Sequence, residues 1–317
     1  MHLGTILTNS QHRAAVLLSD GNVLDIAAAS VNVSGDVGET LRKSSLQAVI
    51  ELGDAAVSAI AVLVADAQAG KHDSACHSLS DVTLLAPLPK PHKNVFCVGR
   101  NYAEHIAEGD RAQKKNVGVT EYPVYFTKPP TAVIGPDAQI PIFPELSESI
   151  DYEVELTAVI GKPGRNIQKE DAYHHIFGYT IMNDITARDV QRRHGGQYFK
   201  GKALDGSCPL GPWIVTADAI GDPQNLSLSL TVNGEQRQSG NTGSMIFDIP
   251  TLIASLSEGL TLEPGDLIAT GTPSGVGYAM EPPQFLKQGD TVICTVENIG
   301  DLQNTLYNVK PEKSSSS

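Results

Sequence analysis

The sequence has little positive charge and no long apolar run. Its 317 residues carry 23 Lys and Arg against 36 Asp and Glu, which gives a net charge of −13. Nucleic acids and anionic membranes bind proteins through basic surfaces, so we expect neither as a partner. The sequence contains no run of about 18 apolar residues, the length needed to span a membrane. Residues 1–10 lack the basic start and apolar core of a signal peptide. We therefore expect a cytoplasmic protein that acts on a small molecule.

Cysteine is scarce as well. Cys76, Cys97, Cys208 and Cys294 are widely spaced and match neither a zinc site nor a dense disulfide framework. We expect these four side chains to be reduced and mostly buried. The His-Glu-x-x-His zinc pattern is also absent. A hydrophobic content of 41% is ordinary for a globular protein with a substantial core, and the length allows two domains.

A proline-rich segment, Ala-Pro-Leu-Pro-Lys-Pro at residues 86–91, favours an extended connection between two domains. The residues before it predict a small α+β domain at 1–90, and residues 91–309 form the larger domain. Residues 310–317, with four serines at the end, predict a disordered tail. The strand-like runs of the first domain lie at 14–18, 23–26 and 82–85, and its helix-like stretches lie around 41–52 and 55–67.

The larger domain contains many short β-type segments separated by glycine and proline, and few helical patterns. This composition predicts an α+β fold that is rich in β-structure. An Asn-Gly step at Asn233 and Gly234, between two alternating runs, indicates a hairpin. The predicted strands lie at 95–98, 124–127, 153–160, 178–185, 226–232, 267–270 and 291–296.

Three carboxylates are the strongest chemical signal. Residues 153–160 read as a strand, so Glu153 and Glu155 share one face. Two carboxylates held that close repel each other unless a cation lies between them, although a half-exposed strand could simply carry two solvated glutamates. Asp184 ends an apolar run and precedes a helix-start pattern. Three carboxylates without Cys or His suit Mg²⁺, Mn²⁺ or Ca²⁺ rather than zinc.

Further polar groups surround this candidate metal site in the sequence. His105 and Glu108 stand three apart on a predicted short helix, where the carboxylate could orient the imidazole as a general base for water. Lys202 could offer a fixed charge to an oxyanion, and Thr272 lies in a glycine-rich turn able to bind a carboxylate. The alternatives are a surface His-Glu pair and a solvated loop lysine.

The order of these motifs over residues 91–306 resembles the fumarylacetoacetate hydrolase family. They are Gly-Arg-Asn-Tyr-x-x-His-x-x-Glu, Asp-Tyr-Glu-x-Glu-Leu, Asn-Asp-x-Thr-Ala-Arg-Asp-x-Gln, Gly-Lys-x-x-Asp and Thr-Gly-Thr-Pro-x-Gly-Val-Gly. The resemblance implies a pseudo-barrel or mixed β-sandwich roll with a small α+β N-terminal domain, usually as a homodimer. It also implies Mg²⁺ or Mn²⁺ at Glu153, Glu155 and Asp184, and a 2-oxo or diketo acid as substrate.

The resemblance further implies roles for individual side chains. Of four catalytic residues, His105 and Glu108 form a dyad on a mobile lid helix that activates water. Lys202 and Gln191 polarise the reacting carbonyl. Three contact the substrate. The catalytic residues are His105, Glu108, Lys202 and Gln191, and the substrate-binding residues are Arg100, Tyr102 and Thr272.

The sequence departs from the family pattern in two places. Many members read Gly-Lys-Ser-x-Asp-Thr-Phe, whereas this chain has Ala203, Gly206 and Ser207, so we expect a hydroxyl on the metal side of the pocket to be missing. No counterpart of an additional aspartate ligand is evident near Arg100. We therefore expect more water in the coordination shell of the metal.

The leading hypothesis is a metal-dependent hydrolase that cleaves a C–C bond in a β-diketo acid of the acylpyruvate or fumarylacetoacetate type. The alternative is decarboxylation of oxaloacetate, or isomerisation or hydration of an unsaturated 2-oxo acid in aromatic catabolism, with the same metal site. A non-catalytic metabolite-binding protein is a third hypothesis. The ligand set, the dyad and Lys202 together favour an enzyme.

Overall fold

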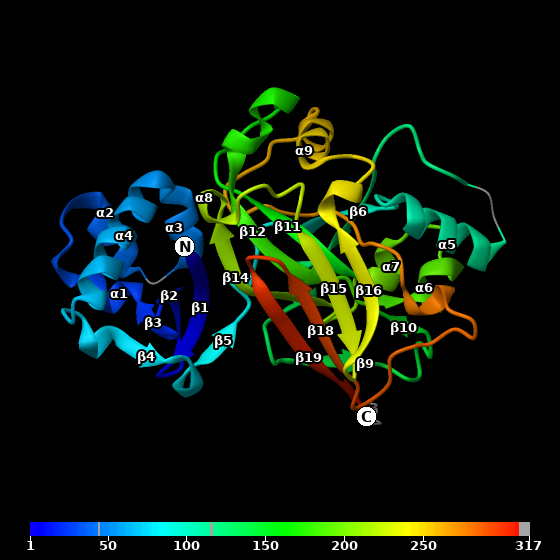
Figure 1. Cartoon of the computed structure of the whole chain (residues 1–317), viewed down its shortest axis with the longest axis horizontal. Helices are drawn as coiled ribbons and strands as arrows, with labels where there is room; N and C mark the ends of the chain where they lie inside the picture. The colour runs from blue at the N-terminus through cyan, green and yellow to red at the C-terminus, as the bar shows by residue number, and fades with distance from the viewer. Residues whose placement is uncertain (44, 115–116, 311–317) are drawn as a thin grey trace, which may run out of the picture.

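The computed structural model describes residues 1–43, 45–114 and 117–310, so nearly all of the expected tail lies outside the described residues. The fold is of the expected class, mixed α+β and rich in strands (Figure 1). The helices are α1 (Ile26–Ala29), α2 (Gly35–Arg42), α3 (Leu46–Leu52), α4 (Asp54–Gln68), α5 (Ala103–Gln113), α6 (Arg188–Arg193), α7 (Phe199–Lys202), α8 (Ala217–Ile220) and α9 (Ile249–Ser257). The strands are β1 (His2–Thr8), β2 (Gln11–Leu17), β3 (Asn22–Asp25), β4 (Cys76–Ser78), β5 (Thr83–Leu85), β6 (Val95–Gly99), β7 (Val124–Lys128), β8 (Val133–Ile134), β9 (Gln139–Ile142), β10 (Ile150–Asp151), β11 (Val154–Ile160), β12 (Ile176–Asn183), β13 (Thr186–Ala187), β14 (Cys208–Thr216), β15 (Ser227–Val232), β16 (Glu235–Asn241), β17 (Leu267–Ala269), β18 (Thr291–Val296) and β19 (Gly300–Asn308).

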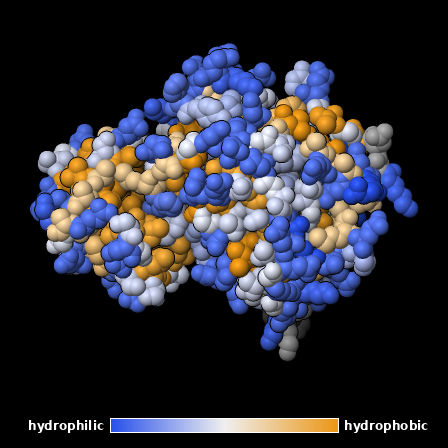
Figure 2. Space-filling model, in the orientation of Figure 1, coloured by the Kyte–Doolittle hydropathy of each residue, from blue (hydrophilic) through white to orange (hydrophobic). Residues whose placement is uncertain are grey.

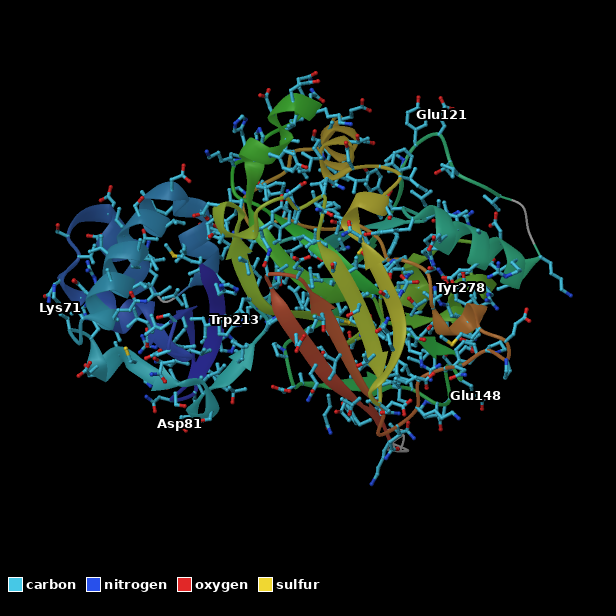
Figure 3. All side chains as sticks on the ribbon, in the orientation of Figure 1. Lys71, Asp81, Glu121, Glu148, Trp213 and Tyr278 are labelled. Atoms are coloured by element: carbon cyan, nitrogen blue, oxygen red, sulfur yellow. The ribbon has the colours of Figure 1, made fainter. Side chains whose placement is uncertain are left out.

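One large sheet runs through both parts of the chain, in the order β4-β3-β2-β1-β14-β12-β11-β17-β6-β7. Strand β1 joins β14 in antiparallel pairing, with Leu3 opposite Ile214. At this junction a Cβ on Gly4 would lie 2.7 Å from the ring of Trp213, so only glycine lets the ring approach (Figure 3). The N-terminal residues thus continue the sheet that carries the site, and the boundary at residue 90 stays a prediction.

A second sheet, in the order β16-β15-β18-β19-β9, packs against the first across the main core. Its hairpin between β15 and β16 confirms the Asn-Gly prediction, because Asn233 and Gly234 have φ values of 52° and 81°. Positive φ at both central residues is what the tightest hairpin turn requires. Figure 1 shows this sheet in front of β11 and β12.

The N-terminal helices differ from the sequence prediction in one respect. The helix-like stretch expected around 41–52 holds the end of α2, which ends at Arg42, and all of α3, which begins after Ser45. The Ser45 side chain accepts the Ala48 N–H. Serine favours the helix N-cap for this reason. In the described part of the chain no single helix is long and apolar enough to cross a membrane; α3 and α4 reach the required length only jointly, across a 118° bend.

Helices α5, α6 and α7 gather at the end of the molecule away from the N-terminal part (Figure 1). On the face shown in Figure 2, hydrophilic and apolar residues are interspersed. The cysteines are free, as expected; Cys97, Cys208 and Cys294 are buried and Cys76 is half-buried. The candidate site lies beneath α5, α6 and α7.

Candidate active site

Three buried carboxylates come together where β11 and β12 meet. Glu153 immediately precedes β11, Glu155 lies within it, and Asp184 follows the last residue of β12. The antiparallel register pairs Val154 with Asn183, and the Asp184 N–H donates a 2.8 Å hydrogen bond to the Glu153 carbonyl. The candidate ligand oxygens of the three carboxylates lie within 4.8 Å of one another.

Strand β11 is buried on both faces, so the alternative of a solvated glutamate face is wrong. Val154 and Leu156 enter the main core from one face. On the other face Glu155 is only 1% exposed and lines a cavity. The alternation of the sequence correctly predicted which side chains share a face of β11. It could not show that other parts of the protein cover both faces.

The cluster fits a divalent cation. Burial, followed by the charges of Asp184 and Glu153, raises the pKa of Glu155 well above its ordinary value. Its side chain accepts a 2.9 Å hydrogen bond from the Gly271 N–H, and no ion pair to it forms within the described ranges. A hard cation among these oxygens would relieve the repulsion and keep Glu155 ionised. Glu153, Glu155 and Asp184 are the residues that could hold it.

Lys202, at the end of α7, joins two of these carboxylates. Its Nζ lies 2.8 Å from Glu153 Oε2, 2.5 Å from Asp184 Oδ2 and 2.8 Å from Thr186 Oγ1. Burial opposes the charged form, but the carboxylates of Asp184 and Glu153 outweigh it and raise the pKa of Lys202. The side chain is therefore a fixed ammonium and not a base, and it is not a solvated loop lysine.

Lys128, the last residue of β7, is a cation that the sequence interpretation missed. It is fully buried, and its Nζ lies 2.7 Å from Asp184 Oδ1. It also donates to the backbone carbonyls of Ile185, at 3.1 Å, and of Lys202. The available signal was a lysine directly after an apolar strand. Its task is to neutralise Asp184 from behind the site.

Arg188, at the start of α6, was missed too, although it lies inside a quoted motif. Its Nη2 lies 2.6 Å from Glu153 Oε1, and its Nε lies 2.9 Å from Asp151 Oδ2. Burial opposes ionisation of Glu153, but Lys202 and Arg188 outweigh it and lower the pKa of that carboxyl. Asp151 also accepts the Gly277 N–H, so it ties α6 to the glycine-rich turn.

The predicted dyad lies on α5. His105 Nδ1 is 2.9 Å from Glu108 Oε1, as the three-residue spacing on one helix face leads one to expect. Glu108 Oε2 accepts a 2.9 Å hydrogen bond from the Gly275 N–H. Both oxygens of this carboxylate are thus engaged, and the imidazole is held at one nitrogen with the other left for chemistry.

A cavity of about 500 Å³ connects the dyad with the carboxylates. Its wall combines charged groups with the aromatic rings of Phe126, Tyr198 and Tyr278. The rings of Phe126 and Tyr198 meet edge to face with centroids 5.7 Å apart. Of the residues singled out from the sequence, those that line it are Arg100, His105, Glu153, Glu155, Gln191, Lys202 and Thr272.

The two expected contacts near residue 100 differ. Arg100 lines the cavity, but its Nη2 is paired with Asp110 at 3.0 Å and donates to the Gly118 carbonyl at 2.9 Å. Tyr102 is 2% exposed, and the structure does not place it among the lining residues described. Burial, with a smaller contribution from Glu155, raises the pKa of the Tyr102 hydroxyl. A substrate contact for Tyr102 stays a prediction.

Thr272 and Gln191 are both oriented by neighbours. The Thr272 hydroxyl accepts a 2.8 Å hydrogen bond from Gln238 Nε2, which leaves its own proton for a ligand. Gln238 also accepts the Val154 N–H at 3.0 Å, so it links the glycine-rich turn of Thr272 to strand β11. Gln191 Oε1 lies 3.4 Å from Arg188 Nη1. Gln238 is a further residue that spacing alone did not indicate.

The departures from the family pattern have visible consequences. Ser207 is buried, and its hydroxyl donates to the Lys202 carbonyl at 2.9 Å and accepts from Lys128 at 3.2 Å. Gly206 has a φ of 69°, and a Cβ there would meet Pro141 at 2.3 Å, so a side chain is excluded. Within the described ranges no fourth acidic residue joins the carboxylate cluster.

Comparisons with known proteins agree with this geometry. The family model of the C-terminal domain of fumarylacetoacetate (FAA) hydrolase matches residues 94–307. Oxaloacetate tautomerase YisK of Bacillus subtilis (strain 168) is 52% identical over 231 residues, which cover 73% of this chain and 75% of that protein.

Two solved structures extend the similarity to nearly the whole chain. Fumarylacetoacetate hydrolase (EaFAH) from psychrophilic Exiguobacterium antarcticum is 39% identical with a TM-score of 0.78 and covers 98% of this chain and 100% of that chain. Maleylpyruvate hydrolase from Sphingobium sp. SYK-6, in complex with manganese(II) ion and pyruvate, is 29% identical with a TM-score of 0.74, at the same coverage. The chain therefore belongs to the fumarylacetoacetate hydrolase family.

Proposed function

We propose that this protein is a metal-dependent enzyme that interconverts the enol and keto forms of oxaloacetate or a closely related 2-oxo acid. The observation that carries this proposal is the placement of the Lys202 ammonium between Glu153 and Asp184, beside the cavity. A relative that is 52% identical is named an oxaloacetate tautomerase. The oxaloacetate alternative is thus better supported than the leading hypothesis of C–C hydrolysis.

Enolate stabilisation is the chemistry that these groups suit. A divalent cation at Glu153, Glu155 and Asp184 would supply Lewis acidity toward the 2-oxo acid head. Lys202 stays protonated because the neighbouring carboxylates raise its pKa. Its fixed positive charge lowers the energy of a developing enolate oxygen.

Tautomerisation also needs one group that takes a proton from the enol oxygen and returns it at C3. We assign this task to His105, which lines the cavity. The Glu108 carboxylate at its Nδ1 favours the tautomer with the proton on that nitrogen, so the Nε2 lone pair is free to accept a proton. The substrate gains and loses one proton in total, so its charge is unchanged.

Hydrolysis of a C–C bond in an acylpyruvate is a second candidate. The His105–Glu108 pair favours it, because the same imidazole could deprotonate water for attack on the distal carbonyl. A structural relative is named maleylpyruvate hydrolase. The two candidates share the enolate and differ in whether water enters the reaction.

The proposed cation is Mg²⁺ or Mn²⁺, because the candidate ligands are carboxylate oxygens and manganese(II) is present in the maleylpyruvate hydrolase structure. We also propose a homodimer in the cytoplasm, from the family resemblance and the sequence. Light scattering on the purified protein tests the dimer.

The deciding experiment compares three reactions of one protein sample with Mg²⁺ or Mn²⁺ and with a chelator. Ketonisation of enol-oxaloacetate is followed by ultraviolet absorbance, decarboxylation by pyruvate formation, and acylpyruvate cleavage by acid release. We expect metal-dependent ketonisation to be the fastest. Rapid acylpyruvate cleavage without faster ketonisation would contradict the tautomerase proposal and support the hydrolase.

A further inference from the structure

The cations of the cavity wall are not equivalent. Four of the five cationic or imidazole side chains lie against an acidic group of the protein, so each of them already has a partner. Arg192 is the exception, since it forms no ion pair within the described ranges. The paired groups are Arg100 with Asp110 (3.0 Å), His105 with Glu108 (2.9 Å), Arg188 with Glu153 (2.6 Å) and Lys202 with Glu153 (2.8 Å).

Arg192 lies one helical turn beyond Arg188 on α6. Both guanidinium groups lie over the ring of Tyr278, 4.4 Å and 5.4 Å from its centroid, so the ring orients both. Figure 3 shows Tyr278 beside α5. Arg188 contacts Glu153, and the four residues from Arg188 to Arg192 rise about 6 Å along the helix axis.

The wall beside Arg192 is open. Gly195 and Gly196 line the cavity with φ values of 63° and 82°, and a Cβ on either would meet nothing within 4 Å. Arg192 itself is exposed. A ligand that enters from this side can therefore reach the guanidinium without displacing a side chain of this turn.

We propose that Arg192 binds the second carboxylate of a short 2-oxo dicarboxylic acid whose 2-oxo acid head lies at the carboxylate cluster. This inference rests on the proposed function. Carbon–carbon bonds of about 1.5 Å separate the two carboxyl carbons of a four-carbon diacid by roughly 4 Å, and a charged hydrogen bond adds about 3 Å. That reach is comparable to the rise of about 6 Å over the four residues from Arg188 to Arg192.

Arg192 then determines specificity without taking part in the chemistry. A substrate with an uncharged distal group leaves the guanidinium facing only Tyr278 and solvent, and it forgoes a charge-assisted hydrogen bond. A solvated surface arginine, the competing explanation, would treat all 2-oxo acids alike. Selectivity for dicarboxylic over monocarboxylic ligands therefore distinguishes a carboxylate-binding Arg192 from a solvated surface arginine.

The test compares Arg192→Met with Arg193→Met, which removes the same charge from the next residue, also exposed and not among the lining residues described. We expect Arg192→Met to raise the KM for oxaloacetate about tenfold or more, with kcat changed only slightly. Arg192→Lys should restore part of the affinity. Inhibition by oxalate, which offers only the head group, should be the same in all variants.

Binding measurements keep this inference separate from the proposed function. Calorimetry with the Mn²⁺-loaded protein gives the affinities for oxaloacetate and pyruvate whether or not either is turned over. If the wild type does not ketonise oxaloacetate, the proposed function is contradicted. If the wild type binds oxaloacetate more tightly than pyruvate and Arg192→Met does not, the assignment of Arg192 as the carboxylate subsite is still supported. Equal affinities in the wild type, or an equal loss for oxaloacetate and oxalate in Arg192→Met, would overturn the assignment of Arg192.

Discussion

Lys128 Nζ lies 2.7 Å from Asp184 Oδ1, and both side chains are fully buried. Lys128 is not among the lining residues described for the cavity, whereas Glu155 is. A buried charge that loses its partner is costly, because neither water nor another group replaces the interaction. This pair therefore supports the site as well as the fold.

Lys128→Met should lower the free energy of unfolding by about 3 kcal/mol or more, since it leaves Asp184 without one of its cations. Saturating Mg²⁺ should recover part of the loss, because it adds positive charge to the same cluster. Urea unfolding with and without Mg²⁺ measures both effects. Lys71→Met, which breaks an exposed pair with Asp66, should cost less than about 1 kcal/mol. An equal effect of the two substitutions would contradict the role of Lys128.

Glu155→Gln should remove most of the stabilisation that a divalent cation gives to the protein. A ligand present at about 100 times its Kd adds roughly 2.7 kcal/mol to the free energy of unfolding. The melting temperature with Mn²⁺ and with a chelator should therefore differ clearly in the wild type and little in the variant. Glu121→Gln, an exposed position marked in Figure 3, serves as control. Full stabilisation of Glu155→Gln by Mn²⁺ would exclude this residue as a ligand.

Glu108→Gln should lower kcat about 10²-fold and leave KM nearly unchanged. The amide oxygen can still accept the Gly275 N–H, so α5 stays anchored, but the carboxylate charge that orients His105 is lost. Steady-state kinetics of enol-oxaloacetate ketonisation gives both kcat and KM. Glu104→Gln on the same helix is the matched control. A change confined to KM would point to anchoring of α5 as the sole role of Glu108.

Gly109→Ala should weaken substrate binding although alanine favours helix more than glycine by about 1 kcal/mol. The added Cβ would lie 2.5 Å from the Tyr278 hydroxyl, so either α5 or the Tyr278 ring, both at the cavity wall, must shift. KM is expected to rise severalfold. The double variant with Tyr278→Phe removes the clashing oxygen and should restore KM toward the value of Tyr278→Phe alone. Additive effects in this cycle would show that the contact does not set the position of α5.

Asp110→Asn should destabilise the protein in a pH-dependent manner. The Gly118 N–H, and then Arg100, lower the pKa of Asp110 despite the cost of burial. Its contribution is complete above the unfolded pKa of about 3.9 and is lost as the pH falls through the lower folded value. At neutral pH the variant should lose at most about 1 kcal/mol, because the side chain is partly solvated. Urea unfolding at neutral pH and near pH 3.5 tests this, with Asp81→Asn as control; a constant difference would contradict it.

The carboxylate cluster could be predicted because its signals are local. Glu153 and Glu155 stand two apart in a strand, and Asp184 ends the next strong apolar run. Adjacent antiparallel strands bring such positions together without any knowledge of the remaining fold. The His105–Glu108 pair is local for the same reason, since three residues form nearly one turn of helix.

Groups that act across several elements could not be predicted in this way. Lys128 lies on β7, which ends the sheet order four strands from β12, yet its side chain reaches Asp184. Gln238 lies on β16 in the second sheet and orients Thr272. Arg192 and its neighbour Arg193 look alike in the sequence, and only the direction of each side chain separates a cavity residue from a surface one.

The sequence by itself determined the charge and composition that argue against a nucleic-acid partner, the strand-rich α+β class, the family and the carboxylates that suit a hard cation. Tertiary structure decided which charges are compensated. Glu153 lies among Lys202, Arg188 and a buried strand, whereas Arg192 faces the cavity without an acid within the described ranges. The physical reason is that electrostatic energy depends on distance and burial, and both are set by contacts between residues far apart in the chain.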